Sequence, residues 1–122
     1  MKFLWTTILA KNMEETLKFY QEIVGLKLNK RFSGGPGTEI CFMGEDDTKL
    51  EIIHNEKVQD IDAGNAVTLG FRVDSLDEML KFVTEKGIQI KTGPVQPNPE
   101  IKFFIVQDPN GIKVQFAQQM NQ

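Results

Sequence analysis

Few side chains in this 122-residue chain have types and positions that could do chemistry. Glu51 stands in the run Lys49-Leu50-Glu51-Ile52-Ile53, which has the character of a half-buried strand. A carboxylate on such a strand can act as a general base on an acidic C–H or accept a hydrogen bond from a ligand. His54, the only histidine, follows three residues later, so the period of two predicts that it points to the opposite face. Glu51 is therefore the candidate catalytic residue.

The single cysteine is a weaker candidate for chemistry than Glu51. Cys41 lies between Ile40 and Phe42 in a predicted strand, and no histidine is placed to activate it. We interpret it as a small buried hydrophobic residue. One cysteine cannot form an internal disulfide and does not by itself make a thiolate metal site, which favours a reducing, cytoplasmic location.

The composition excludes several classes of partner. The chain has 14 Lys and Arg against 17 Asp and Glu, a net charge of −3, so it lacks the basic footprint of a nucleic-acid or polybasic membrane-binding protein. No apolar run approaches the ~20 residues needed to span a bilayer. Residues 3–10 are better interpreted as a buried strand than as a signal peptide. We expect a small-molecule partner, no nucleic acid and no membrane.

An internal repeat organises the chain. Residues 12–19 resemble residues 75–82 at an offset of 63, and residues 48–52 lie on 112–116 at an offset of 64. A one-residue gap after the first helix explains the change of offset. The same offsets align two pairs of positions: Trp5 with Thr68, and Glu51 with Gln115.

Each repeat predicts the order β-α-β-β-β. Asn12 and Ser75 are the expected helix N-caps, and Gly25 and Gly87 the expected C-terminal glycines. The predicted strands are 3–10, 26–32, 39–43 and 49–54, then 66–73, 88–92, 101–106 and 112–117. Residues 93–100, with three prolines, are predicted as a loop that serves either as a lid of limited motion or as a plain surface connection.

The predicted fold class is α+β. Two paired modules of about 60 residues form a curved mixed sheet with a concave cleft and helices on the outer face. We expect one domain over 1–122, with module one at about 1–55, a polar linker at 56–65 and module two at about 66–119.

This pattern resembles the vicinal oxygen chelate superfamily, which includes glyoxalase I, the bleomycin-resistance proteins and the extradiol dioxygenases. The resemblance covers nearly the whole chain. Three pieces carry it: Phe19-Tyr20 followed by Val24-Gly25-Leu26-Lys27-Leu28; the strand Lys49-Leu50-Glu51-Ile52-Ile53; and Phe104 to Gln107 followed by Asp108-Pro109-Asn110-Gly111 and the strand Ile112 to Phe116.

The resemblance implies a divalent metal held by one side chain from the first and one from the last strand of each module. Those places fall on Trp5, Glu51, Thr68 and Gln115. Metal-binding members typically have His at the first-strand places and Glu, sometimes Gln, at the last-strand places. Here Trp5 offers only an N–H donor and Thr68 is a weak neutral ligand, so Glu51 alone is a good ligand. We expect no metal and no cofactor.

The expected function is that of a glyoxalase/bleomycin-resistance-like protein that binds a small, planar organic ligand in its cleft without the usual metal. Two alternatives stay open. One is a glyoxalase I-like lyase or isomerase, as in a lactoylglutathione lyase. The other is a metal-free enzyme with Glu51 as general base. The resemblance also implies a homodimer. The predicted ligand-binding residues are Trp5, Thr7, Thr68, Arg72 and Gln115.

Each of these residues also has a structural interpretation. Trp5 could stack on a ligand or merely fill the space of a lost metal. Glu51 could pair with Arg72. Thr68 and Gln115 could satisfy each other or Glu51 by hydrogen bonds.

Overall fold

The computed structural model describes residues 1–58 and 60–120 and divides the chain into two compact units, Met1–Asp62 and Ala63–Gln122. We call them the N-terminal and C-terminal modules and describe each by itself. Residue 59 of the predicted linker lies outside the described residues. That the two modules form one domain stays a prediction.

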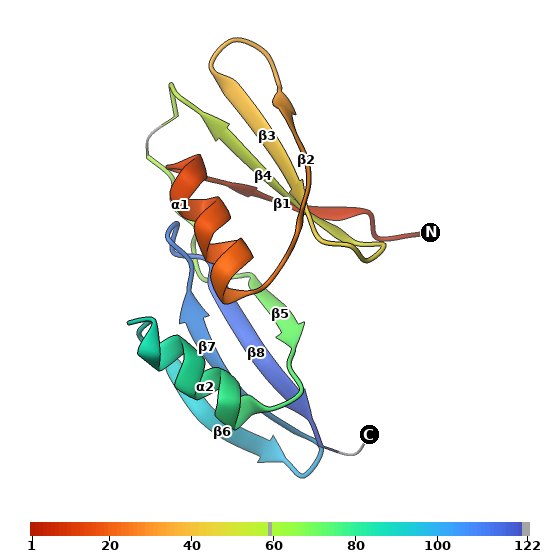
Figure 1. The fold of residues 1–122 in the computed structure, drawn as a ribbon, viewed down its shortest axis with the longest axis vertical. Coiled ribbons are helices and arrows are strands. Elements are labelled where there is room, and N and C mark those ends of the chain that lie inside the picture. The colour runs from red at the N-terminus through yellow and green to blue at the C-terminus, as the bar shows by residue number, and fades with distance from the viewer. Residues whose placement is uncertain (59, 121–122) are drawn as a thin grey trace. The chain divides into compact units, whose positions relative to one another are not determined.

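The N-terminal module is a four-stranded mixed sheet in the order β1-β4-β3-β2 (Figure 1). Strands β1 and β4 run parallel, and the other neighbours are antiparallel. Its elements are β1 (Trp5–Leu9), α1 (Met13–Lys18), the π-helical turn η1 (Phe19–Ile23), β2 (Leu28–Ser33), β3 (Thr38–Met43) and β4 (Lys49–Asn55).

The C-terminal module repeats this topology in the order β5-β8-β7-β6, with β5 and β8 parallel. Its elements are β5 (Thr68–Arg72), α2 (Leu76–Glu85), β6 (Thr92–Asn98), β7 (Ile101–Gln107) and β8 (Lys113–Gln119). The predicted α+β class, with two β-α-β-β-β modules, is confirmed.

Both helices begin where the sequence predicts. The Asn12 side chain accepts a hydrogen bond from the Glu15 amide at 2.9 Å, and the Ser75 hydroxyl accepts one from the Glu78 amide at 3.2 Å. These caps satisfy amides that the first turn of a helix leaves free. The first helix differs from expectation near its end, where it widens into η1 before Gly25 at φ 83°.

One face of each sheet is buried against the helix of the same module (Figure 1). In the N-terminal module Ile8, Cys41 and Ile52 point to this face together with α1, and in the C-terminal module Phe104 and Phe116 do so with α2. Because side chains alternate along a strand, the residues between them point to the other face. We call that second face the open face of each module.

Two predictions were wrong in the C-terminal module. Residues 88–91 are not a strand, and residues 93–98 are not a loop or lid but part of the edge strand β6. Its pairing with β7 is irregular, with partners only at Thr92, Val95 and Asn98. Prolines are tolerated there because an edge strand leaves some amides without a ladder partner.

Candidate functional site

Three predicted site residues meet on the open face of the N-terminal module. Strands β1 and β4 lie side by side with Thr7 opposite Glu51, and Trp5 precedes Thr7 by one period of two. Trp5 and Thr7 are exposed and Glu51 is half-buried. The two adjacent strands therefore place Trp5, Thr7 and Glu51 together.

The closest polar contact on this face joins Thr7 and Glu51. The Thr7 hydroxyl donates a hydrogen bond to Glu51 Oε1 at 2.5 Å. A hydrogen bond to a carboxylate is stronger than one between neutral groups. It restricts the orientation of the carboxyl group and engages Oε1, so that Oε2 is the oxygen that Thr7 does not contact.

Aromatic rings flank this pair. The Trp5 ring meets Phe42 edge to face at 5.6 Å between centroids, and Phe32 stacks on Phe42 at 6.1 Å. Phe42 is directly opposite Glu51 in the β3–β4 pairing, so the contact with Trp5 reaches across β4. Trp5 remains 46% exposed and Phe32 43% exposed, which leaves ring surface for a planar ligand.

Phe32 and Phe42 are candidate site residues that the sequence analysis missed. Each phenylalanine follows a residue of the helix-facing side, Arg31 or Cys41. Alternation along each strand therefore predicts that Phe32 and Phe42 point to the open face. Placing them beside Glu51 also requires the register of the two hairpins, which alternation alone does not supply.

Two lysines share the open face. Lys49 is opposite Trp5, and Lys30 is opposite Phe42. The Lys49 ammonium donates to the backbone carbonyl of Asp46 in the β3–β4 turn. The face thus carries both signs of charge around one carboxylate.

The remaining predicted residues lie in the C-terminal module. There Thr68 is opposite Lys113, Gly70 is opposite Gln115 and Arg72 is opposite Ala117. Gly70 has no side chain at the position that corresponds to Thr7 in the first module. A Cβ added at Gly70 would lie 3.5 Å from Gln115 Oε1. Because Arg72 and Glu51 belong to different modules, their pairing stays a prediction.

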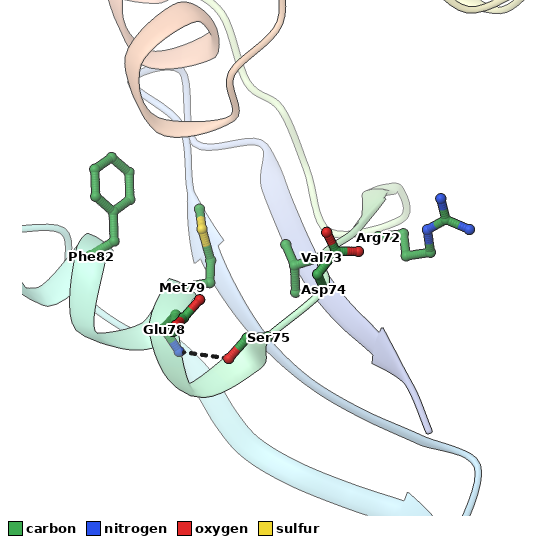
Figure 2. Close-up of a pocket in the computed structure, with 7 residues that line it drawn as sticks. All are labelled: Arg72, Val73, Asp74, Ser75, Glu78, Met79 and Phe82. Carbon is green, nitrogen blue, oxygen red and sulfur yellow. Dashed lines mark hydrogen bonds between the residues drawn. The ribbon is translucent and has the colours of Figure 1, made fainter. Parts of the chain in front are cut away.

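An open depression in the C-terminal module includes Arg72 but no other predicted site residue (Figure 2). It lies where β5 leads into α2, and its lining is Arg72, Val73, Asp74, Ser75, Glu78, Met79 and Phe82. In Figure 2 the Arg72 guanidinium points away from Met79 and Phe82. The Ser75 hydroxyl is already engaged in capping α2.

Two other reactive side chains face the helix side, as predicted. His54 Nδ1 lies 2.9 Å from the Ala10 carbonyl oxygen, on the face opposite Glu51. Cys41 is fully buried, and burial raises the pKa of its thiol. A raised pKa lowers the thiolate fraction, so Cys41 is a poor nucleophile.

The donor set does not fit a divalent metal. Among the described residues no three His, Cys, Asp or Glu side chains come together as a metal site. Of the four positions that the family resemblance points to, only Glu51 is anionic, and it already accepts the Thr7 hydroxyl. The indole of Trp5 has no lone pair to give.

The comparisons with known proteins identify the class. The model of the Glyoxalase/Bleomycin resistance protein/Dioxygenase superfamily matches residues 2–116. A lactoylglutathione lyase of Neisseria meningitidis serogroup A is 32% identical over 126 residues, which cover 97% of this chain and 91% of that protein. This chain belongs to the superfamily.

Solved structures show the same fold with different functions. The Leishmania major glyoxalase I matches at a TM-score of 0.84 and 19% identity over 97% of this chain and 86% of that one. TnmS3, an antibiotic binding protein from a Streptomyces species, matches at a TM-score of 0.77 and 20% identity over 98% of this chain and 96% of that one. The fold by itself therefore does not choose between chemistry and binding.

The described part of the chain contains no helix that is long and apolar enough to cross a membrane.

Proposed function

We propose that this chain binds a small organic molecule with a planar apolar part on the open face of its N-terminal module. The observation that carries the proposal is the Glu51 carboxylate, fixed by the Thr7 hydroxyl at 2.5 Å beside partly exposed aromatic rings. Apolar surface together with a few oriented polar groups is the usual composition of a small-molecule site. Thr68, Arg72 and Gln115 are proposed as further contacts from the C-terminal module.

A second candidate is a lyase or isomerase of the glyoxalase type. The relatives favour it over binding alone, because the protein from Neisseria meningitidis and that from Haemophilus influenzae, 27% identical over 97% of this chain, are both lactoylglutathione lyases. Glu51 is the residue that would remove a proton from carbon next to a carbonyl. The hydrogen bond from Thr7 to Oε1 leaves Oε2 to accept that proton, which supports this candidate.

The binding proposal is tested by titrating a panel of planar organic compounds and following the fluorescence of Trp5, the only tryptophan. The variant Glu51→Gln keeps the side-chain shape and removes the charge. We expect it to weaken binding about tenfold or more, the loss of a charged hydrogen bond of about 1.5–3 kcal/mol. Glu45→Gln, the same change in an exposed turn, is the matched control and should bind as the parent does.

The enzymatic candidate is tested by following lactoylglutathione turnover in parent protein and Glu51→Gln. Turnover that falls at least 100-fold in Glu51→Gln but not in Glu45→Gln supports the lyase. Ligand binding without turnover supports the binding protein. A ligand that binds equally well to the parent and to Glu51→Gln contradicts the binding proposal, and turnover that Glu51→Gln leaves unchanged contradicts the lyase.

The homodimer and the cytoplasmic location remain predictions. The first is read out by light scattering of the purified chain. The second is read out by fractionation of cells that express it.

A further inference from the structure

We infer that Glu51 is held as a hydrogen-bond acceptor for an organic ligand rather than as a ligand of a divalent metal. The residues at three positions, Trp5, Thr68 and Gln115, are responsible for the loss of metal affinity. The part that concerns the organic ligand rests on the proposed function. The part that concerns the metal stands separately.

The first step is that each module holds its two candidate positions in the same strand register, and we call each such pair of positions a half-site. In the N-terminal module Trp5 is opposite Lys49, two residues before Glu51. In the C-terminal module Thr68 is opposite Lys113, two residues before Gln115. Both pairs of strands are parallel and have the same register, so what differs between the half-sites is the side chains.

The second step is that the side chains of the N-terminal half-site already contact other protein groups. Glu51 Oε1 accepts the Thr7 hydroxyl at 2.5 Å. The Trp5 ring lies against Phe42, on the strand beyond β4, at 5.6 Å between centroids. The indole N–H can donate a hydrogen bond but cannot coordinate a cation.

The third step is that the C-terminal half-site supplies only neutral oxygen. Thr68 is an exposed hydroxyl, and Gln115 offers one amide oxygen. The N-terminal half-site holds one carboxylate and the C-terminal half-site holds none, so neither approaches the three or four imidazole, thiolate or carboxylate groups that hold zinc firmly. His54 cannot compensate, because its Nδ1 lies against the Ala10 carbonyl on the opposite face.

The fourth step is that Glu51 keeps an oxygen for a ligand. With Oε1 bonded to Thr7, Oε2 keeps its lone pairs for a donor, on the same sheet face as the partly exposed ring of Trp5. The matching chemistry is a planar molecule with an N–H or O–H donor at its edge. A metal ion would instead need further anionic or imidazole partners at this point.

The test is calorimetric titration of tag-free protein with Ni²⁺, Zn²⁺ and Co²⁺ alone. We expect no saturable binding to the parent chain. We expect the variant Trp5→His with Thr68→His and Gln115→Glu to bind these ions saturably, with an apparent affinity at least 100-fold above the detection limit of the parent titration. Adding Glu51→Gln to that variant should remove the gain.

Circular dichroism and a cooperative thermal transition establish that the triple variant is folded. The double variant Trp5→His with Gln115→Glu is a second route if it is not, and should gain at least tenfold in affinity. Stoichiometric binding of an ion to the parent chain that Glu51→Gln abolishes would overturn the inference. A folded triple or double variant that binds no ion would also overturn it, because other features would then prevent coordination.

These outcomes are separate from those of the proposed function. Organic-ligand titrations use the parent chain with no metal added, so a failure there leaves the metal result unaffected. A parent chain that binds metal would contradict the inference even where an organic ligand is found.

Discussion

The two modules have one topology and one register but different open faces. At equivalent places the N-terminal module has Trp5, Thr7 and Glu51, whereas the C-terminal module has Thr68, Gly70 and Gln115. Large and charged groups in the N-terminal module correspond to small and neutral ones in the C-terminal module. The helix-facing sides are alike, with buried apolar residues in both. A repeat can thus keep its core pattern while only one copy retains a carboxylate.

The two modules also differ in net charge. Residues 1–62 have eight Lys and Arg against eleven Asp and Glu, whereas residues 63–122 have six of each. The whole net charge of −3 therefore belongs to the N-terminal module. The alternation of apolar residues fixes the core, and the remaining positions are free to diverge.

The largest expected effect tests whether the two cores are equivalent. Phe116 in β8 and Ile52 in β4 are 1% and 0% exposed at matching places. Phe116→Ala should cost about 3–5 kcal/mol and Ile52→Ala about 2–5 kcal/mol in the free energy of unfolding, measured in urea. Leu9→Ala, on the open face, is the control and should cost much less. A loss below about 1 kcal/mol in either core variant would contradict the burial of that residue.

The next effect concerns a glycine at the start of strand β6 in the C-terminal module. Gly93 has φ 89°, and a Cβ there would lie 2.8 Å from the Phe103 carbonyl oxygen. Gly93→Ala should therefore cost about 1–3 kcal/mol of stability in urea unfolding. An unchanged stability would show that the start of β6 adjusts freely.

A smaller effect concerns a group of ion pairs within the N-terminal module. Arg31 in β2 bonds to Glu39 in β3 at 2.6 Å and to Glu14 in α1 at 2.5 Å. These contacts raise the pKa of its guanidinium, the bond to Glu39 most of all. Arg31→Met should cost about 0.5–1 kcal/mol, because the group is partly exposed to water. The loss should shrink at high salt, and a loss that is independent of salt would point to packing instead.

The smallest expected effect comes from a substitution that makes the open faces of the two modules more alike. Gly70 stands where Thr7 stands in the first module, in ordinary strand conformation and with room for a Cβ. Gly70→Ala should raise stability by about 0.5 kcal/mol, because it reduces the freedom of the unfolded strand. A loss of stability would mean that the Gln115 side chain cannot accommodate a methyl group at Gly70.

Much of the fold follows from residue patterns. The caps Asn12 and Ser75 and the repeat offset predicted both modules. Alternation along the strand predicted that His54 points to the other face of the sheet from Glu51. Strand β6 was missed because an edge strand tolerates Pro94 and Pro97, which read as loop residues. Phe42 was missed at the site because its position beside Glu51 depends on hairpin register. Alternation along a single strand does not contain that register.

The most direct test of the central claim is amide and indole NMR of the chain with a ligand found in the Trp5 fluorescence screen. The account predicts that the largest shifts occur at the Trp5 indole N–H and at the amides of Thr7, Phe42 and Glu51. It also predicts that Glu51→Gln reduces those shifts at equal ligand concentration. Shifts confined to the depression at the start of α2, around Ser75 and Phe82, would contradict it.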